Sequence, residues 1–245
     1  MARTVVIDCF AASAEKYGKG CAVVAVDVIR ATTTLLTALS LGRRIYPARS
    51  TDEAAAMARL LDKPLLVGEL GGNVPYGYDL TNSPVLVTAL STVNGGAFTA
   101  PERPIILTSS SGVPLLLDAK NSDATYAGCL RNYSAMAEHL ARHHDRVALI
   151  GAGTRGEFRR EDQLGCAWIA EKLLAAGFEA EDDKTRALVD RWHNSDLQPI
   201  REGKSADYLR RSGQVFDLEF VLSNIDDLKL VPIFKGGAMV DVNAS

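Results

Sequence analysis

Three turns in this sequence combine hydroxyl groups or glycines with the junction between an apolar run and a predicted helix. They are residues 28–34, 109–114 and 151–156. A helix N-terminus offers free backbone N–H groups and a partial positive charge, and both favour anions. In parallel α/β sheets, ligands bind outside the carboxyl ends of strands, where such turns lie. The three turns therefore predict an anion site, most simply a site for phosphate.

The first turn has the most specific chemistry. The helix that follows it opens with three β-branched hydroxyl residues, Thr32, Thr33 and Thr34. Because β-branched residues lose side-chain freedom in a helix, their presence favours a chemical role such as binding phosphate oxygens. Arg30 can add a bidentate clamp, and Asp27 stands where a metal ligand or nucleophile is expected. An ion pair between Asp27 and Arg30, with a threonine that only caps the helix, is an equally weighted alternative.

The second and third turns supply further candidates. Ser110, Ser111 and Gly112 are predicted to contact phosphate or a second anionic group, although a solvated serine loop is the simpler interpretation. Residues 151–156 match the G-x-G-x-x-G pattern of dinucleotide-binding sites. The match is weak because the predicted helix begins only near residue 161, and no strand ending in an acidic residue follows. Arg155 in this turn is a candidate contact for an anionic group of the substrate.

The longest irregular segment, residues 68–84, contains four glycines and two prolines. Loops of this length in compact domains are often functional. Glu69 in this loop is predicted to bind a metal ion together with Asp27, since Mg²⁺ typically takes one or two carboxylates plus water and phosphate. Asn82 is a candidate phosphate contact. In the alternative interpretation, the two carboxylates serve separate turns.

Apolar runs and helical patterns alternate along the chain. The predicted strands are residues 4–7, 22–27, 44–46, 64–67, 104–108, 124–127, 146–150 and 230–233. The predicted helices are residues 32–41, 50–61, 132–143 and 161–176, with Ser50 and Asn132 as caps and peripheral helices in 182–213. This alternation predicts an α/β fold with a mostly parallel or mixed sheet. We expect one domain over residues 1–245, or two closely packed lobes.

Composition and charge exclude several classes of protein. Apolar residues make up 47% of the chain and charged residues 23%, as in globular domains. A net charge of −3 gives no strong attraction to nucleic acid. The four cysteines are widely spaced and predict buried thiols in a reducing compartment. Asp8 comes too early for the apolar core of a signal peptide, and no apolar run is as long as a membrane span. We therefore expect a cytoplasmic protein without a membrane partner. A homo-oligomer is compatible with these features.

Several segments together resemble the 2-phosphosulfolactate phosphatase family. They lie at residues 26–34, 68–72, 77–84, 151–158 and 161–162, and include Asp-x-x-Arg-Ala-Thr-Thr-Thr and Asp-x-x-Asn-Ser-Pro. The resemblance covers about residues 5–233. It implies a layered α/β/α fold and Mg²⁺-dependent hydrolysis of a phosphate ester, which yields sulfolactate for coenzyme M biosynthesis.

Two departures from the family pattern bear on the substrate. The family usually has Glu-Arg-Gly-Gly where this chain has Leu70 after Glu69, and a Thr-Thr-Asn-Gly-Thr-like turn where this chain has serines. The missing arginine removes an anion contact. The loss of this contact therefore affects recognition of the sulfonate-bearing substrate more than the phosphatase chemistry.

We therefore expect Mg²⁺-dependent hydrolysis of a small anionic phosphate monoester. Asp27 and Glu69 are the expected metal ligands, Arg30 and the threonine turn hold the phosphoryl group, and the serine turn with Arg155 holds a second anionic group. The nucleophile is either a metal-activated water or Asp27 through an aspartyl-phosphate. The alternatives are a protein that binds a phosphorylated metabolite without turnover and a nucleotide-dependent oxidoreductase that uses residues 151–156.

Overall fold

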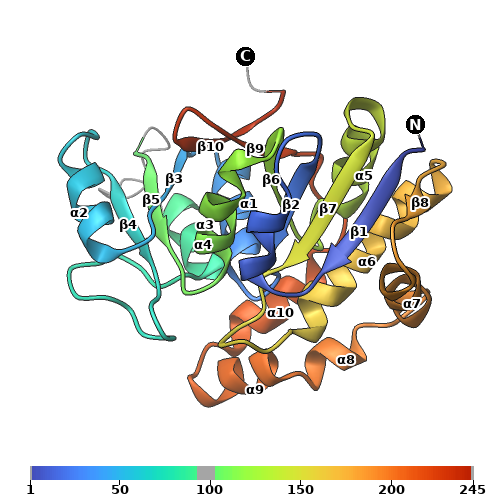
Figure 1. Cartoon of the computed structure of the whole chain (residues 1–245). Coiled ribbons are helices and arrows are strands. Elements are labelled where there is room, and N and C mark those ends of the chain that lie inside the picture. Colours follow the sequence, from blue (N-terminus) through green and yellow to red (C-terminus); the bar gives the residue numbers. More distant parts are fainter. Residues whose placement is uncertain (1, 93–102, 244–245) are drawn as a thin grey trace.

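The computed structural model of the chain describes residues 2–92 and 103–243. These residues form one sheet of ten strands with helices on both faces (Figure 1). The strands are β1 (Thr4–Asp8), β2 (Ala22–Val26), β3 (Ile45–Pro47), β4 (Leu65–Gly68), β5 (Ile105–Thr108), β6 (Ala124–Gly128), β7 (Arg146–Gly151), β8 (Glu179–Ala180), β9 (Pro232–Lys235) and β10 (Ala238–Asp241).

The helices fill the connections between the strands. They are α1 (Ala31–Ser40), α2 (Thr51–Ala58), α3 (Pro84–Thr92), α4 (Gly112–Asp118), α5 (Tyr133–His143), α6 (Arg160–Ala175), α7 (Asp183–Trp192), α8 (Gln198–Arg201), α9 (Lys204–Arg211) and α10 (Val215–Ser223), with short 3-10 helices η1 (Ala11–Lys16) and η2 (Ala119–Asn121). Figure 1 shows α8, α9 and α10 gathered at the end of the sheet toward which β1 and β7 point.

The two faces of the sheet carry separate apolar cores, because successive residues of a strand point to opposite sides. Val5 and Ile7 of β1 belong to the core formed with α5, α6 and α7. Val6 of the same strand belongs to the core formed with α1 and α4. Every residue of β2 is buried, as expected for a valine-rich strand covered on both faces. These observations confirm the predicted three-layer α/β/α arrangement.

The sheet is mixed, and its strands run in two opposed groups. Its order is β4-β5-β3-β10-β9-β6-β2-β7-β1-β8. Within β4-β5-β3 and within β6-β2-β7-β1-β8 the pairing is parallel, whereas β9 and β10 pair antiparallel with each other and with their outer neighbours. Strand twist of about 20–25° accumulates at each step. Five steps separate β5 from β2, so the carboxyl ends of opposed groups can approach one another.

Most predicted elements are present within two or three residues of their expected bounds, but two strands were not predicted. The short β8 and the strand β10 escaped detection, and the last predicted strand, 230–233, is displaced to β9. β9 and β10 form a hairpin around Gly236 and Gly237, which both have positive φ. This hairpin joins the two parallel groups, a role that depends on pairing with β3 and β6.

Two predicted helix caps have different outcomes. The Ser50 hydroxyl accepts a hydrogen bond from the backbone N–H of Glu53, which confirms the predicted cap of α2. Asn132 directly precedes α5, but its side chain does not cap that helix. Its Oδ1 instead accepts from the Cys129 N–H, and its Nδ2 donates to the Leu230 carbonyl. The amide that the local pattern assigned to the helix therefore bonds to one backbone group three residues earlier and to one 98 positions away.

All four cysteines are free and buried, as predicted. Within the described ranges, none of the helices combines the length and the apolar character needed to span a membrane. The prediction of one domain over residues 1–245 stays a prediction.

Candidate active site

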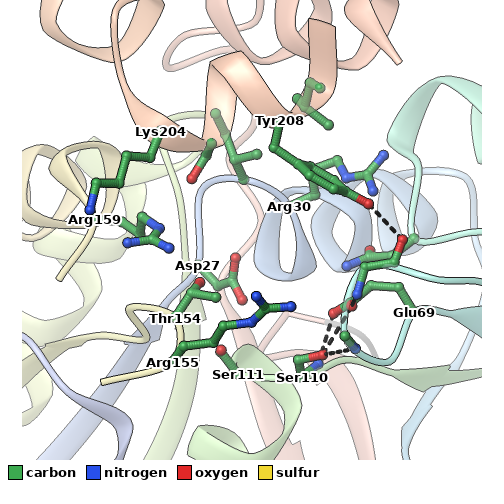
Figure 2. A pocket seen from close by; sticks show the side chains of 16 residues that line it. Asp27, Arg30, Glu69, Ser110, Ser111, Thr154, Arg155, Arg159, Lys204 and Tyr208 are labelled. Atoms are coloured by element: carbon green, nitrogen blue, oxygen red, sulfur yellow. Dashed lines mark hydrogen bonds between the residues drawn. The ribbon is translucent and has the colours of Figure 1, made fainter. Parts of the chain in front are cut away.

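A pocket of about 410 Å³ opens where the turns after β2, β4, β5 and β7 face α9 (Figure 2). This volume suits a small-molecule ligand. Of the residues predicted from the sequence, the pocket wall includes Asp27, Arg30, Glu69, Asn82, Ser110, Ser111 and Arg155. The three turns singled out by their composition thus contribute to one cavity.

Asp27 lies at the floor of the pocket and is 7% exposed. Its carboxylate accepts hydrogen bonds from the backbone N–H groups of Ala31 and Gly112. A Cβ on Gly112 would lie 2.6 Å from Asp27 Oδ2, so only glycine allows this close approach. Burial raises the pKa of Asp27 to about 7, and the nearby charges of Glu69 and Glu161 add to the effect.

Two further carboxylates lie buried next to Asp27. Glu161 and Asp162 are only 1% and 3% exposed, although both stand in the first turn of α6, where the helix N-terminus alone favours negative charge. Burial raises both pKa values, and for Asp162 the charges of Asp27 and Glu161 raise it further. One oxygen of Glu161 has no hydrogen-bond partner among the described residues. Their sequence position within a family motif was the one signal of a role at this site.

Asp162 ties together two of the turns that form the pocket. Its Oδ1 accepts from the Val28 N–H at 2.9 Å, and its Oδ2 accepts from the Gly153 N–H at 3.0 Å. Val28 follows Asp27 in the turn after β2, whereas Gly153 belongs to the turn after β7. The buried carboxylate therefore sets the spacing between the floor and one wall.

The threonine hydroxyls predicted to bind phosphate do not reach the pocket. The Thr32 hydroxyl accepts from the Asp27 N–H and donates to the Asp27 carbonyl, and the Thr33 hydroxyl donates to the Val28 carbonyl. Thr34 is also buried, and its hydroxyl oxygen has no partner among the described residues. The prediction is corrected here: the Thr32 and Thr33 hydroxyls close the turn that presents Asp27, and none of the three threonines belongs to the pocket lining.

Arg30 lines the pocket, but its ion pair is with a residue far along the chain. Its Nη1 lies 2.5 Å from Asp217 Oδ2 and also donates to the Gln214 side chain. Asp217 in turn accepts from the Ser83 hydroxyl at 2.6 Å. The alternative of an ion pair between Asp27 and Arg30 is therefore wrong. Arg30 is instead held by α10, which carries Asp217 and directly follows Gln214.

Glu69 lies on the opposite wall, directly after β4. Its two oxygens accept from the N–H groups of Ser110 and Gly72 at 2.8 and 2.7 Å, and from the Ser110 hydroxyl at 2.9 Å. These bonds join the loop after β4 to the turn after β5. Asn82, from the end of the same loop, is 3% exposed and lines the pocket with an unpaired Oδ1 among the described residues.

Three cations gather on the wall formed by the turn after β7 and by α9. They are Arg155, Arg159 and Lys204. Arg155 has a φ of +53°, a conformation uncommon outside glycine that clusters at functional sites, and it forms no ion pair among the described residues. Figure 2 shows Arg159 and Lys204 on one side of the pocket, Glu69 and Ser110 on the other, and Asp27 between them.

Helix α9 covers the pocket, which the sequence did not indicate. The Tyr208 hydroxyl donates to the Gly72 carbonyl at 2.6 Å, so the helix is connected to the loop on the far wall (Figure 2). Lys204, Ser205 and Leu209 also face the cavity. The segment was correctly predicted as helical, but its polar composition resembled an ordinary solvated surface.

Comparison with known protein families matches residues 5–237 to the family described as 2-phosphosulpholactate phosphatase. The chain belongs to this family. Three relatives named "Probable 2-phosphosulfolactate phosphatase" illustrate the similarity. The one from Caldanaerobacter subterraneus subsp. tengcongensis is 30% identical over 88% of both chains. Those from Pseudothermotoga lettingae and Deinococcus radiodurans are 34% and 32% identical, over 86% and 89% of this chain and 88% and 90% of theirs.

Membership in the phosphatase family agrees with the resemblance expected from the sequence motifs. It also accounts for the weak dinucleotide pattern at residues 151–156. Thr154 and Glu157 pair as a β-bridge in this segment, and α6 begins only at Arg160. The turn therefore lines the pocket through Thr154 and Arg155, and its glycines do not open a helix.

The donors in the pocket fit a cation held partly by substrate. Among the described residues, no group of three or more His, Cys, Asp or Glu side chains forms a preassembled metal site. Asp27 and Glu69 nevertheless both line the cavity, and burial together with the charges of Glu69 and Glu161 raises the pKa of Asp27. Mg²⁺ commonly uses one or two carboxylates with water and phosphate oxygens. The side chains of the pocket are therefore compatible with this ion.

Proposed function

We propose that this chain is a Mg²⁺-dependent phosphatase of a small anionic phosphate monoester, with 2-phosphosulfolactate as its substrate. The observation that carries the proposal is the pocket of a family member in which the buried carboxylate of Asp27 faces a wall of cations. Carboxylates suit a metal ion and phosphoryl transfer, whereas cations suit the anionic substrate.

Asp27 and Glu69 are the residues that would hold Mg²⁺. The ion, when bound, offsets negative charge on the phosphoryl oxygens in the transition state. Asp27 is positioned by the N–H groups of Ala31 and Gly112, and Glu69 by those of Gly72 and Ser110. The fixed orientation of both carboxylates reduces the reorganisation that the reaction requires.

Arg30 and Arg155 are the proposed contacts for the phosphoryl group, although the sequence pattern favours Arg155 for a second anionic group. Arg30 is aligned by Asp217, and this ion pair occupies one side of its guanidinium while the residue still lines the pocket. The threonine turn contributes by shaping the backbone around Asp27. Ser111 and the amide of Asn82 add hydroxyl and amide groups along the same cavity.

Asp27 has two possible roles in the bond-breaking step. It can attack phosphorus, which breaks the P–O bond to the substrate alcohol and forms an aspartyl-phosphate that water then hydrolyses. Alternatively, it can accept a proton from a water that attacks phosphorus while the same P–O bond breaks. A pKa near 7 suits a general base, since such a group is available to both accept and release a proton at neutral pH. Trapping a phosphorylated Asp27 after rapid acid quench distinguishes the two routes.

The remaining proposals concern location and partners. We propose a cytoplasmic protein, supported by four free buried cysteines, which suit a reducing compartment. A net charge of −3 supports the absence of a nucleic-acid partner. Association into a homo-oligomer is also proposed, and size measurement in solution tests it.

Phosphate release from a panel of phosphoesters tests the function directly. The panel contains 2-phosphosulfolactate, 2-phospholactate and glycerol 2-phosphate, each with Mg²⁺ and with EDTA. We expect release with Mg²⁺, fastest for 2-phosphosulfolactate, and none with EDTA. Saturable binding of the phosphoester without release of phosphate would instead support a binding protein.

A further inference from the structure

One exposed carboxylate holds two of the pocket cations in the free protein. Glu157 Oε2 lies 2.7 Å from Lys204 Nζ and 3.2 Å from Arg159 Nη1. These two cations come from different elements, since Lys204 begins α9 and Arg159 directly precedes α6. Their hydrogen bonds and charges lower the pKa of Glu157, so its carboxylate is ionised at neutral pH. A single anionic group is thus sufficient to bring the two cations together.

Both cations line the pocket, whereas Glu157 lies outside its lining. The Arg159 side chain is 14% exposed and the Lys204 side chain is 73% exposed. The position of Glu157 is set by its backbone, which exchanges two hydrogen bonds with Thr154 at 2.8 and 3.0 Å. The carboxylate that pairs with the two cations therefore belongs to a residue outside the pocket lining.

We propose that Arg159 and Lys204 form a subsite for an anionic group on the carbon skeleton of the substrate, and that the Glu157 carboxylate forms ion pairs with both cations until the substrate binds. The inference rests on the proposed function and adds to it a separation of tasks within the pocket. The reacting phosphate belongs near Asp27, and the carboxylate or sulfonate belongs at the cationic wall.

The charge distribution supports this separation. Asp27 and Glu69 are the proposed metal ligands and the phosphate binds beside them, so a second acid group of the substrate needs a separate cationic contact. Arg30, which is held by Asp217, is the proposed contact for the phosphoryl group. The cationic wall lies on the side away from Glu69 (Figure 2). Exposed ion pairs are weak and screened by salt, so a substrate anion that also gains contacts inside the pocket can displace the carboxylate of Glu157.

Paired substrates test the subsite. 2-Phosphosulfolactate carries a carboxylate and a sulfonate, 2-phospholactate carries only the carboxylate, and glycerol 2-phosphate carries neither. We expect Arg159→Met and Lys204→Met to raise KM for 2-phosphosulfolactate about tenfold, as loss of a partly solvated charge-assisted contact would. KM for glycerol 2-phosphate should change less than twofold. The response of 2-phospholactate identifies which acid group is bound.

Arg211→Met is the matched control, because Arg211 lies on the same helix as Lys204 but does not line the pocket. It removes the same charge and should leave KM for all three substrates unchanged. Equal increases in KM for all three substrates in Lys204→Met would overturn the subsite. A rise in KM in Arg211→Met as large as in Lys204→Met would show a general charge effect and also overturn it.

Glu157→Gln tests whether the Glu157 carboxylate competes with the substrate for Arg159 and Lys204. Because this variant removes the competing charge, we expect KM for 2-phosphosulfolactate to fall about two- to fivefold, the range of an exposed ion pair. An unchanged or increased KM would show that Glu157 does not compete.

Direct calorimetric binding of sulfolactate separates this inference from the proposed function. Wild-type protein should bind sulfolactate more tightly than Lys204→Met, whether or not phosphate is released from any ester. Binding without turnover would contradict the phosphatase and leave the subsite supported. Turnover with equal sulfolactate binding by wild type and Lys204→Met would support the phosphatase and overturn the subsite.

Discussion

The guanidinium of Arg30 and the carboxylate of Asp217 form an ion pair of 2.5 Å with both side chains only 4% exposed. The pair joins the turn after β2, which presents Asp27, to α10. Asp217 also accepts from the Ser83 hydroxyl, which lies next to the pocket residue Asn82. One buried carboxylate therefore links the turn with Asp27, the end of the loop that follows β4, and the C-terminal helices.

Removing this carboxylate should destabilise the protein. Asp217→Asn leaves the guanidinium of Arg30 buried without a counter-charge, and we expect a loss of about 3–5 kcal/mol in the free energy of unfolding. Chemical denaturation measures it. Asp227→Asn is the matched control, because it breaks the pair with Arg131 where the carboxylate is 34% exposed. We expect a clearly smaller loss there, and equal losses in both variants would contradict the role assigned to burial.

The raised pKa of Asp27 makes stability depend on pH. Its ordinary value is 3.8 and burial raises it to about 7, so the folded protein holds a proton that the unfolded chain releases. The resulting stabilisation is present below about pH 4 and is lost as the pH rises to about 7. We expect Asp27→Asn to show a smaller decrease in Tm between pH 5 and pH 8 than the wild-type protein. The same variant should lose phosphatase activity. Parallel changes of Tm with pH in the variant and the wild-type protein would refute the raised pKa of Asp27.

Two neighbouring threonines provide a test of the corrected role of the turn. Thr32→Val removes the hydroxyl that bonds both the N–H and the carbonyl of Asp27, leaving a buried N–H unpaired. We expect a loss of about 1–3 kcal/mol in stability. Thr34→Val removes a buried hydroxyl oxygen that lacks a partner among the described residues, so it should be neutral or stabilising. Urea unfolding of both variants checks this, and a Thr34→Val variant that is the less stable of the two would contradict it.

The hydrogen bond between Tyr208 and Gly72 should affect substrate binding more than stability. The bond is exposed and connects α9 to the opposite wall of the pocket, so Tyr208→Phe removes a connection across the cavity while the ring stays. We expect KM to rise about two- to fivefold with a Tm within about 2 °C of wild type, since exposed hydrogen bonds contribute little net stability. Steady-state kinetics and calorimetry measure the two effects. A large drop in Tm with unchanged KM would show a purely structural role.

Divalent cation binding has a readout that does not require turnover. A cation that binds only the folded protein raises Tm, and at pH 8 we expect Mg²⁺ to stabilise the wild-type protein. The increase should be smaller in Asp27→Asn and in Glu69→Gln, because each removes a proposed ligand. Glu53→Gln is a control in the first turn of α2, outside the pocket lining. An equal Mg²⁺-dependent increase in all four proteins would place the ion elsewhere.

Local patterns in the sequence were sufficient for the elements and for part of the site. The all-buried run of β2, the Ser50 cap and the apolar periodicities are short-range features, so they predict strands and helices directly. Asp27 and Glu69, which both line the pocket, were singled out for the same reason: each follows a strand end, and strand ends supply ligand sites in α/β folds. The buried thiols likewise follow from apolar neighbours in the chain.

Only the tertiary structure decided which partners these residues meet. Arg30 pairs with Asp217, 187 positions away, and α9 covers a pocket whose other walls lie far earlier in the chain. The burial of Glu161 and Asp162 also depends on packing against distant elements. Such contacts are selected by the collective packing of the sheet, the hairpin β9–β10 and the C-terminal helices. A local pattern encodes the conformation of a segment, but it does not encode the surface against which that segment packs.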